Sequence, residues 1–142
     1  MGFVRIVSAA PGRGEQTLAW ALAAVAAVLA VGGSLLNLYG RVALYDEVTH
    51  AYNFFALTLL VAVYAYGAVL TGAREHAVLV VLVIAAIGLA LGAVWEIAEW
   101  SYDHFIAKPE VILPKTDTIV DMILDTAGAL VAGTVRVWML RK

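Results

Sequence analysis

Carboxylate side chains gather at three places in this otherwise apolar sequence. Nineteen uncharged residues, Ala77 to Trp95, run directly into Glu96 and Glu99 in the segment "GAVWEIAEWSYDH". Acids and a histidine also stand together in "YDEVTH", and acids recur at every fourth position in "DTIVDMILD". Carboxylates with an imidazole suit Mg²⁺, Mn²⁺, Fe²⁺ or Zn²⁺, and helix bundles build such sites from facing helices. The pattern therefore predicts a divalent-metal site.

The spacing within each group predicts one polar stripe per helix, because side chains three or four residues apart share a helix face. The predicted metal ligands are Asp46, His50, Glu96, Glu99, Asp117, Asp121 and Asp125. Facing lipid costs an ionisable side chain on the order of 3 kcal/mol or more, so we expect the stripes to face the interior of the protein. The ligand pattern differs from the Glu and Glu-x-x-His pattern of di-iron bundles, which leaves the identity and number of metal ions open.

The composition predicts a membrane protein. Of the 142 residues, 63% are hydrophobic and 14% are charged, against about 45–50% and about 25% in soluble domains. Long apolar stretches of this kind span membranes. We expect an all-α, polytopic protein, a bundle of four antiparallel transmembrane helices. The expected spans are 17–40, 51–70, 77–100 and 117–140, within a single domain of residues 17–142 that follows a tail at 1–16. A signal peptide is the alternative for the first span, but its apolar run exceeds the usual length of about 7–15 residues.

Lysine and arginine gather on one side of these expected spans by six to three. The larger group comprises Arg5, Arg13, Arg74, Arg136, Arg141 and Lys142, and the smaller group comprises Arg41, Lys108 and Lys115. Positive charge favours the cytoplasmic side. Both termini are therefore expected in the cytoplasm of a multi-pass cell-membrane protein, and the acids at the extracytoplasmic helix ends. Arg136 lies within the last turns of its span, and we expect its side chain to extend to the interface.

The sequence says less about the binding partners of this protein. A net charge of −2 gives no reason to expect nucleic acid, and the absence of cysteine excludes disulfides and thiolate metal sites. Membrane lipid is the expected surrounding, and the oligomeric state is left open.

Simpler interpretations exist for some of these residues. Asp46 and Asp117 stand at helix starts, where a short acid caps free N–H groups. Asp103 and His104 fit a solvated connection. Capping does not explain the other predicted ligands, for which the alternative to a metal or proton site is a protonated, hydrogen-bonded polar core with a structural role.

The segments "YDEVTHAYNFF", "WEIAEW" and "DTIVDMILDTAGAL" resemble the YjdF-type family of small predicted membrane proteins over about residues 41–133. The chain also resembles VanZ-type proteins in the Asp-x-x-x-His at a helix start. The YjdF-type motifs map onto all seven predicted ligands and onto Gly128. At position 126 the resemblance predicts an amide, and this chain has threonine. The resemblance supports the site and implies no reaction.

As an enzyme, the chain would hydrolyse or transfer a lipid-linked phosphate with the help of the metal ion, with Glu99 or Asp103 as the general base. The alternatives are a non-enzymatic protein that binds or transports ions or protons, and a structural membrane subunit. Because the acids end about halfway along the expected bundle and the other half is apolar, a conduction path through a single chain is disfavoured.

Overall fold

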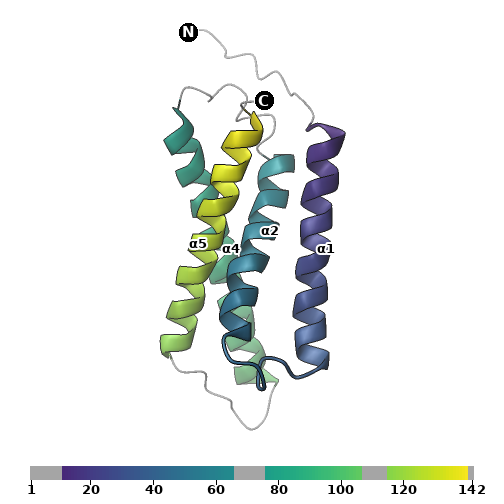
Figure 1. Ribbon diagram of the computed structural model, residues 1–142. Helices are drawn as coiled ribbons and strands as arrows, with labels where there is room; N and C mark the ends of the chain where they lie inside the picture. The colour runs from purple at the N-terminus through teal and green to yellow at the C-terminus, as the bar shows by residue number, and fades with distance from the viewer. Residues whose placement is uncertain (1–10, 66–75, 107–114, 141–142) are drawn as a thin grey trace.

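The computed structural model describes residues 11–65, 76–106 and 115–140, which fold into four antiparallel helices without a strand (Figure 1). The helices are α1 (Arg13–Leu35), α2 (Tyr45–Ala65), α4 (Ala77–Phe105) and α5 (Lys115–Leu140). The predicted all-α bundle is confirmed. α1 begins four residues before its expected span of 17–40, and α4 ends five residues after its expected span of 77–100. Some of the predicted features lie outside the described residues. They are most of the predicted tail, the turn with Arg74, and the charges Arg5, Lys108, Arg141 and Lys142.

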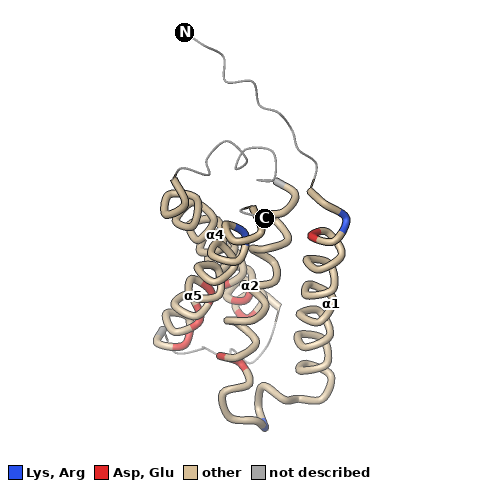
Figure 2. Tube along the Cα trace, turned by 45° about the horizontal axis from the view of Figure 1, so that its top comes forward, with Lys and Arg blue, Asp and Glu red and all other residues tan. Residues whose placement is uncertain are grey.

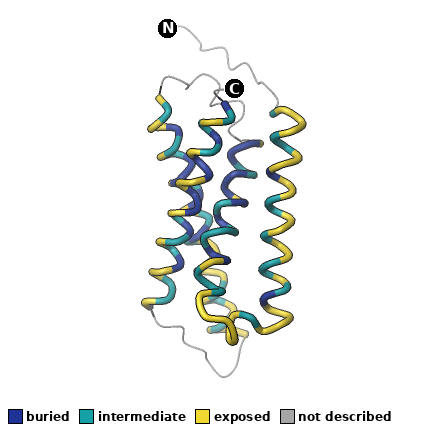
Figure 3. Tube along the Cα trace, in the orientation of Figure 1, coloured by how far each residue is buried: buried dark blue, intermediate teal, exposed yellow. Residues whose placement is uncertain are grey.

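Three of the described helices are long and apolar enough to cross a membrane: α1, α4 and the Thr116–Leu140 part of α5. Their outward faces carry large exposed apolar side chains such as Val28, Leu82 and Ile123. α2 packs against all three, and most closely against α5. Figure 3 shows the buried residues on the facing sides of these helices. The helix with His50 therefore packs against all three of these helices.

Small residues let the backbones of α2, α4 and α5 approach one another. A Cβ atom on Gly128 would collide with the backbone carbonyl of Ala51 and lie 2.9 Å from the backbone nitrogen of Phe55. A Cβ atom on Gly88 would collide with Ala129 on α5. Gly88 and Gly92, a G-x-x-x-G pair on α4, thus both face α5.

Side-chain hydrogen bonds attach α1 to α2. The Tyr45 hydroxyl donates to the backbone carbonyl of Leu29 at 2.8 Å, and the Trp20 indole N–H donates to the Tyr64 hydroxyl at 2.8 Å. Tyr52 donates to another carbonyl of α1 at 3.3 Å. These bonds lie near both ends and the middle of the helix pair, so they fix how α1 is placed along α2.

Arg136 turns into the bundle rather than outward. Its residue surface is 1% exposed, and its Nη1 atom lies 3.0 Å from Oε2 of Glu15 in the first turn of α1. The expectation that Arg136 extends to the membrane interface is therefore wrong. The partner that holds it inside belongs to a helix at the other end of the sequence, so the local sequence around Arg136 carried no sign of it.

Candidate metal centre

The acidic residues of α2, α4 and α5 gather toward one end of the bundle (Figure 2). This end contains the start of α2, the end of α4 and the start of α5, as expected for alternating helices. His50, Glu96, Asp121 and Asp125 are buried there, and Asp46, Glu99 and Asp117 are half-buried. The prediction that the acids share one level is confirmed.

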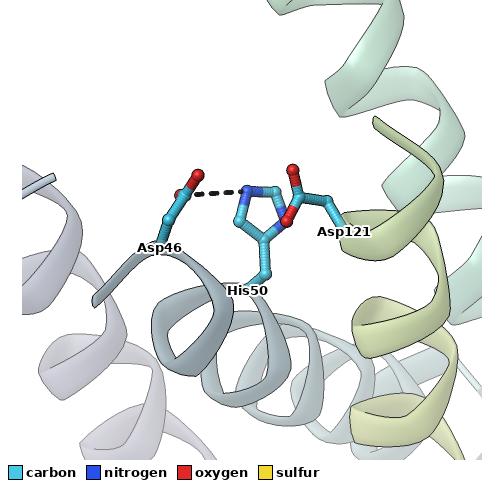
Figure 4. Close-up of side chains that lie close together, drawn as sticks. All are labelled: Asp46, His50 and Asp121. Atoms are coloured by element: carbon cyan, nitrogen blue, oxygen red, sulfur yellow. Dashed lines mark ion pairs between the residues drawn. The ribbon is translucent and has the colours of Figure 1, made fainter. Parts of the chain in front are cut away.

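The imidazole of His50 lies at the centre of this cluster, between carboxylates from two helices. Its Nδ1 atom is 3.0 Å from Oδ1 of Asp125, and its Nε2 atom is 3.6 Å from Oδ1 of Asp46. Asp121 approaches the ring from α5 (Figure 4). The ring of Phe54, one turn along α2, stacks near that of His50 with centroids 6.1 Å apart. Contacts from several directions thus restrain the histidine ring.

The two nitrogen atoms of His50 are in different situations. The 3.0 Å contact between Nδ1 and Asp125 has hydrogen-bond length, and Nδ1 is the donor when the Asp125 carboxylate is ionised. In the neutral ring with this tautomer, Nε2 carries the lone pair on the side of Asp46. The 3.6 Å distance from Nε2 to Asp46 is too long for a hydrogen bond. Nε2 is therefore available as a ligand atom.

Two overlapping groups of potential ligand atoms result, each with all its atoms within 4.8 Å of one another. The first group, called the outer group here, is Asp46, His50 and Asp121; the second, called the inner group, is His50, Glu96 and Asp125. The structure thus brings together five of the seven predicted ligands. Glu99 and Asp117 belong to neither group, although each lies about one helical turn from a member.

Local structure explains why these side chains can converge. α2 begins directly after Leu44, whose φ of 62° turns the chain into the helix, and the Thr49 hydroxyl donates to the carbonyls of Tyr45 and Asp46. On α4, Gly92 faces Asp125, and a Cβ atom at this position would collide with Oδ2 of Asp125. Gly92 thus leaves space for a carboxylate.

Several buried oxygen atoms of this region have no hydrogen-bond partner among the described residues. They are Oε1 of Glu96, Oδ2 of Asp125 and Oδ1 of Asn53. Burial of an unpaired polar group is costly, and burial of an unpaired charge costs far more. Asn53 was not among the predicted ligands, although its position three residues after His50 on α2 was a signal that could have included it.

The predicted general bases lie outside both ligand groups. Glu99 and Asp103 are half-buried on the last turns of α4, toward the end of the bundle. His104 is exposed and stacks on Trp100, with ring centroids 5.1 Å apart. Three groups that could move protons therefore lie on the last turns of α4.

Residues 13–142 match a family described as "Predicted membrane protein (DUF2238)". The chain belongs to this family. The match confirms the resemblance to YjdF-type membrane proteins. The chain is also similar to an uncharacterised protein of Thermotoga maritima, with 29% identity over 101 residues. This covers 69% of the present chain and 50% of the relative, so the chain spans about half the length of the relative that it matches. No solved structure matches the chain.

Proposed function

We propose that this membrane protein binds a divalent metal ion through the outer group, Asp46, His50 and Asp121. The observation that carries the proposal is the His50 ring. Its Nδ1 lies 3.0 Å from buried Asp125, its Nε2 lies 3.6 Å from Asp46, and the ligand atoms of Asp46, His50 and Asp121 lie within 4.8 Å of one another. Histidine ligands in metalloproteins commonly donate their other N–H to a carboxylate, which fixes the tautomer and strengthens the ligand. The Asp125–His50 pair supports this arrangement before any ion binds.

The distances also support an ion between these ligands. Metal–ligand bonds of about 2.0–2.2 Å in a tetrahedral site place neighbouring ligand atoms about 3.4 Å apart. The 3.6 Å separation of Nε2 and Oδ1 of Asp46 is close to this value. One imidazole with two carboxylates suits Zn²⁺, Fe²⁺ or Mn²⁺ better than Mg²⁺. Three protein ligands would leave a coordination position for water or substrate.

The reaction that such an ion would support is hydrolysis or transfer of a lipid-linked phosphate. A bound ion polarises a phosphoryl oxygen and lowers the pKa of a bound water toward about 7. Glu99, one turn outward from Glu96, would act as general base, with Asp103 as the second candidate. Their position outside the ligand groups supports this division of roles.

Ion or proton conduction is the rival function, and the interior of the bundle disfavours it. Between the centre and Arg136, apolar side chains fill much of the described interior. They include Ala56, Leu59, Val63, Ile84 and Ala132. Such packing leaves little room for a continuous row of water or polar groups. A binding site at one end of the bundle fits this packing better than a path through it, and a structural subunit would not need the open Nε2 position.

Elemental analysis of the purified protein tests metal binding. The parent is expected to retain Zn²⁺, Fe²⁺ or Mn²⁺ after dialysis, and His50→Ala and Asp46→Asn are expected to lose most of it. Glu47→Gln is the matched control, since Glu47 neighbours Asp46 but belongs to neither ligand group. Parent protein that neither retains these ions nor is stabilised by them would exclude the proposal.

Release of phosphate from a polyprenyl diphosphate by the metal-loaded protein in detergent tests the reaction. Loss of a general base typically lowers the rate by about 10²–10⁴-fold, so Glu99→Gln should reduce turnover on this scale and keep the metal. The turnover of Asp103→Asn, measured in the same way, tests the second candidate for the general base. Full metal occupancy without phosphate release would leave a binding protein and remove the enzymatic part of the proposal.

A further inference from the structure

Glu96 and Asp125 of the inner group present buried oxygen atoms that the outer metal ion would not use. Asp125 has no exposed surface and Glu96 is 9% exposed. Oδ1 of Asp125 is engaged by His50, whereas Oδ2 of Asp125 and Oε1 of Glu96 have no hydrogen-bond partner among the described residues. Two neighbouring carboxylates, from α4 and α5, thus each hold an unpartnered oxygen in the interior.

The charge balance of the cluster also favours a second cation beside these two carboxylates. Four carboxylates, those of Asp46, Glu96, Asp121 and Asp125, surround His50, which is neutral when Nδ1 is protonated and Nε2 binds metal. One divalent ion in the outer group neutralises two of the four negative charges. The remaining two belong to the residues with the unpartnered oxygens, in a region where an isolated charge is very costly.

The absence of a side chain at Gly92 makes room for the carboxylate of Asp125 at this place. A methyl group on Gly92 would collide with Oδ2 of Asp125. The amide oxygen of Asn53, also buried and unpartnered, lies on the following turn of α2 after His50. Glu96, Asp125 and Asn53 therefore offer oxygen atoms as possible metal ligands: two carboxylates and one amide carbonyl.

We propose a second cation site, made of oxygen ligands, between Glu96 and Asp125, about one helical turn deeper than the outer group. Oxygen-only ligand sets suit hard cations such as Ca²⁺, Mg²⁺ or Mn²⁺, whereas the imidazole of the outer group suits Zn²⁺ or Fe²⁺. The two sites therefore select different classes of ion. This second site rests on the proposed function, which assigns His50 to the outer ion. Asp125 connects the two sites, because it holds His50 with one oxygen and the inner cation with the other.

Binding of ⁴⁵Ca²⁺ to the full chain in detergent, before and after loading with Zn²⁺, tests this proposal. The parent is expected to bind Ca²⁺ in addition to Zn²⁺. Glu96→Gln should lower Ca²⁺ affinity by about tenfold or more and retain Zn²⁺, since loss of a ligand weakens its own site most. Asp46→Asn should show the opposite pattern. Zn²⁺ retained by Glu96→Gln also demonstrates that this variant is folded.

Three results would overturn the second site. The parent could bind no Ca²⁺ when Zn²⁺ is present, which would indicate that Glu96 and Asp125 share a proton instead. Zn²⁺ could displace Ca²⁺ completely, with Asp46→Asn abolishing both, which would indicate one site. Glu96→Gln could bind Ca²⁺ as the parent does. By contrast, Ca²⁺ binding that depends on Glu96 in a protein that binds no Zn²⁺ would refute the outer site alone.

Discussion

At the scale of single residues, the orientation of His50 is the feature on which the candidate centre depends. Asp125 fixes the ring from α5, Phe54 packs beside it, and Asp46 precedes it by one turn on the same helix. An imidazole that could rotate freely would lose entropy on binding an ion. A ring already held in the binding orientation avoids that cost.

Asp125→Asn tests the orienting role. The variant removes the charge that stabilises Nδ1–H and keeps nearly the same shape, so Zn²⁺ affinity should fall by about 10–100-fold. The measurement is competition with a chromophoric chelator in detergent. Asp117→Asn is the matched control, because Asp117 is an acid of the same helix that belongs to neither ligand group. Equal affinities of the two variants would contradict an orienting role for Asp125.

At the scale of helices, close backbone contact between α2 and α5 aligns the residues of the centre. Gly128 lies one turn beyond Asp125 on α5 and faces the backbone of Ala51 and Phe55 on α2. His50 directly precedes Ala51. The spacing of the two backbones at Gly128 therefore controls the distance between His50 and Asp125.

Gly128→Ala should separate the two helices. The added methyl group has only backbone atoms to displace, so we expect a loss of about 1–3 kcal/mol of unfolding free energy, together with weaker Zn²⁺ binding. Gly32→Ala on α1 is the control, since a Cβ atom there meets nothing within 4 Å and alanine favours helix by about 0.5–1 kcal/mol. Denaturant titration in mixed micelles compares the two. A Gly128→Ala variant as stable as Gly32→Ala would contradict the close contact.

The attachment of α1 is a second property at this scale. Arg136 is buried and its guanidinium approaches Glu15, so removal of the carboxylate leaves a buried positive charge unpaired. Breaking a buried pair in this way costs about 3–5 kcal/mol, and we expect less for Glu15→Gln because its side chain is 28% exposed.

A double-mutant cycle separates the pair from other effects of Glu15. The combined Glu15→Gln and Arg136→Gln variant should recover part of the stability lost in Glu15→Gln, since it no longer buries an unpaired charge. Arg13→Gln, which changes an exposed residue of the same helix turn, should leave stability unchanged. Strict additivity of the two single substitutions would show that the observed contact does not contribute to stability.

At the scale of the whole molecule, helices of alternating direction place the first turn of α1 and the last turn of α5 at the same end, opposite the candidate centre. With the six-to-three bias of positive charge, this predicts cytoplasmic termini and an extracytoplasmic centre. A fluorescent reporter fused after Lys142 should be active in the cytoplasm. An epitope inserted within residues 107–114 should be labelled from outside intact cells. The reverse labelling would place the centre on the cytoplasmic side.

Much of this architecture follows from the sequence. Long uncharged segments determine helices in a membrane, because only internally hydrogen-bonded backbones are stable in lipid. Alternation of direction then brings "YDEVTH", "WEIAEW" and "DTIVDMILD" to the same level, and helical spacing places the acids of each segment on one face. These properties depend on local periodicity and on the order of segments, which a single sequence contains in full.

Tertiary structure decided the partners within that level. Spacing did not distinguish Asp125, which hydrogen-bonds to His50, from Asp117, which belongs to neither ligand group. It also could not reveal that Gly92 leaves space for a carboxylate or that Arg136 turns inward to Glu15. Each of these contacts depends on the rotation and separation of two helices that are distant in the chain. Packing of all the helices together sets that rotation, so the sequence determined which side chains reach the same end of the bundle and only the assembled bundle determined which of them touch.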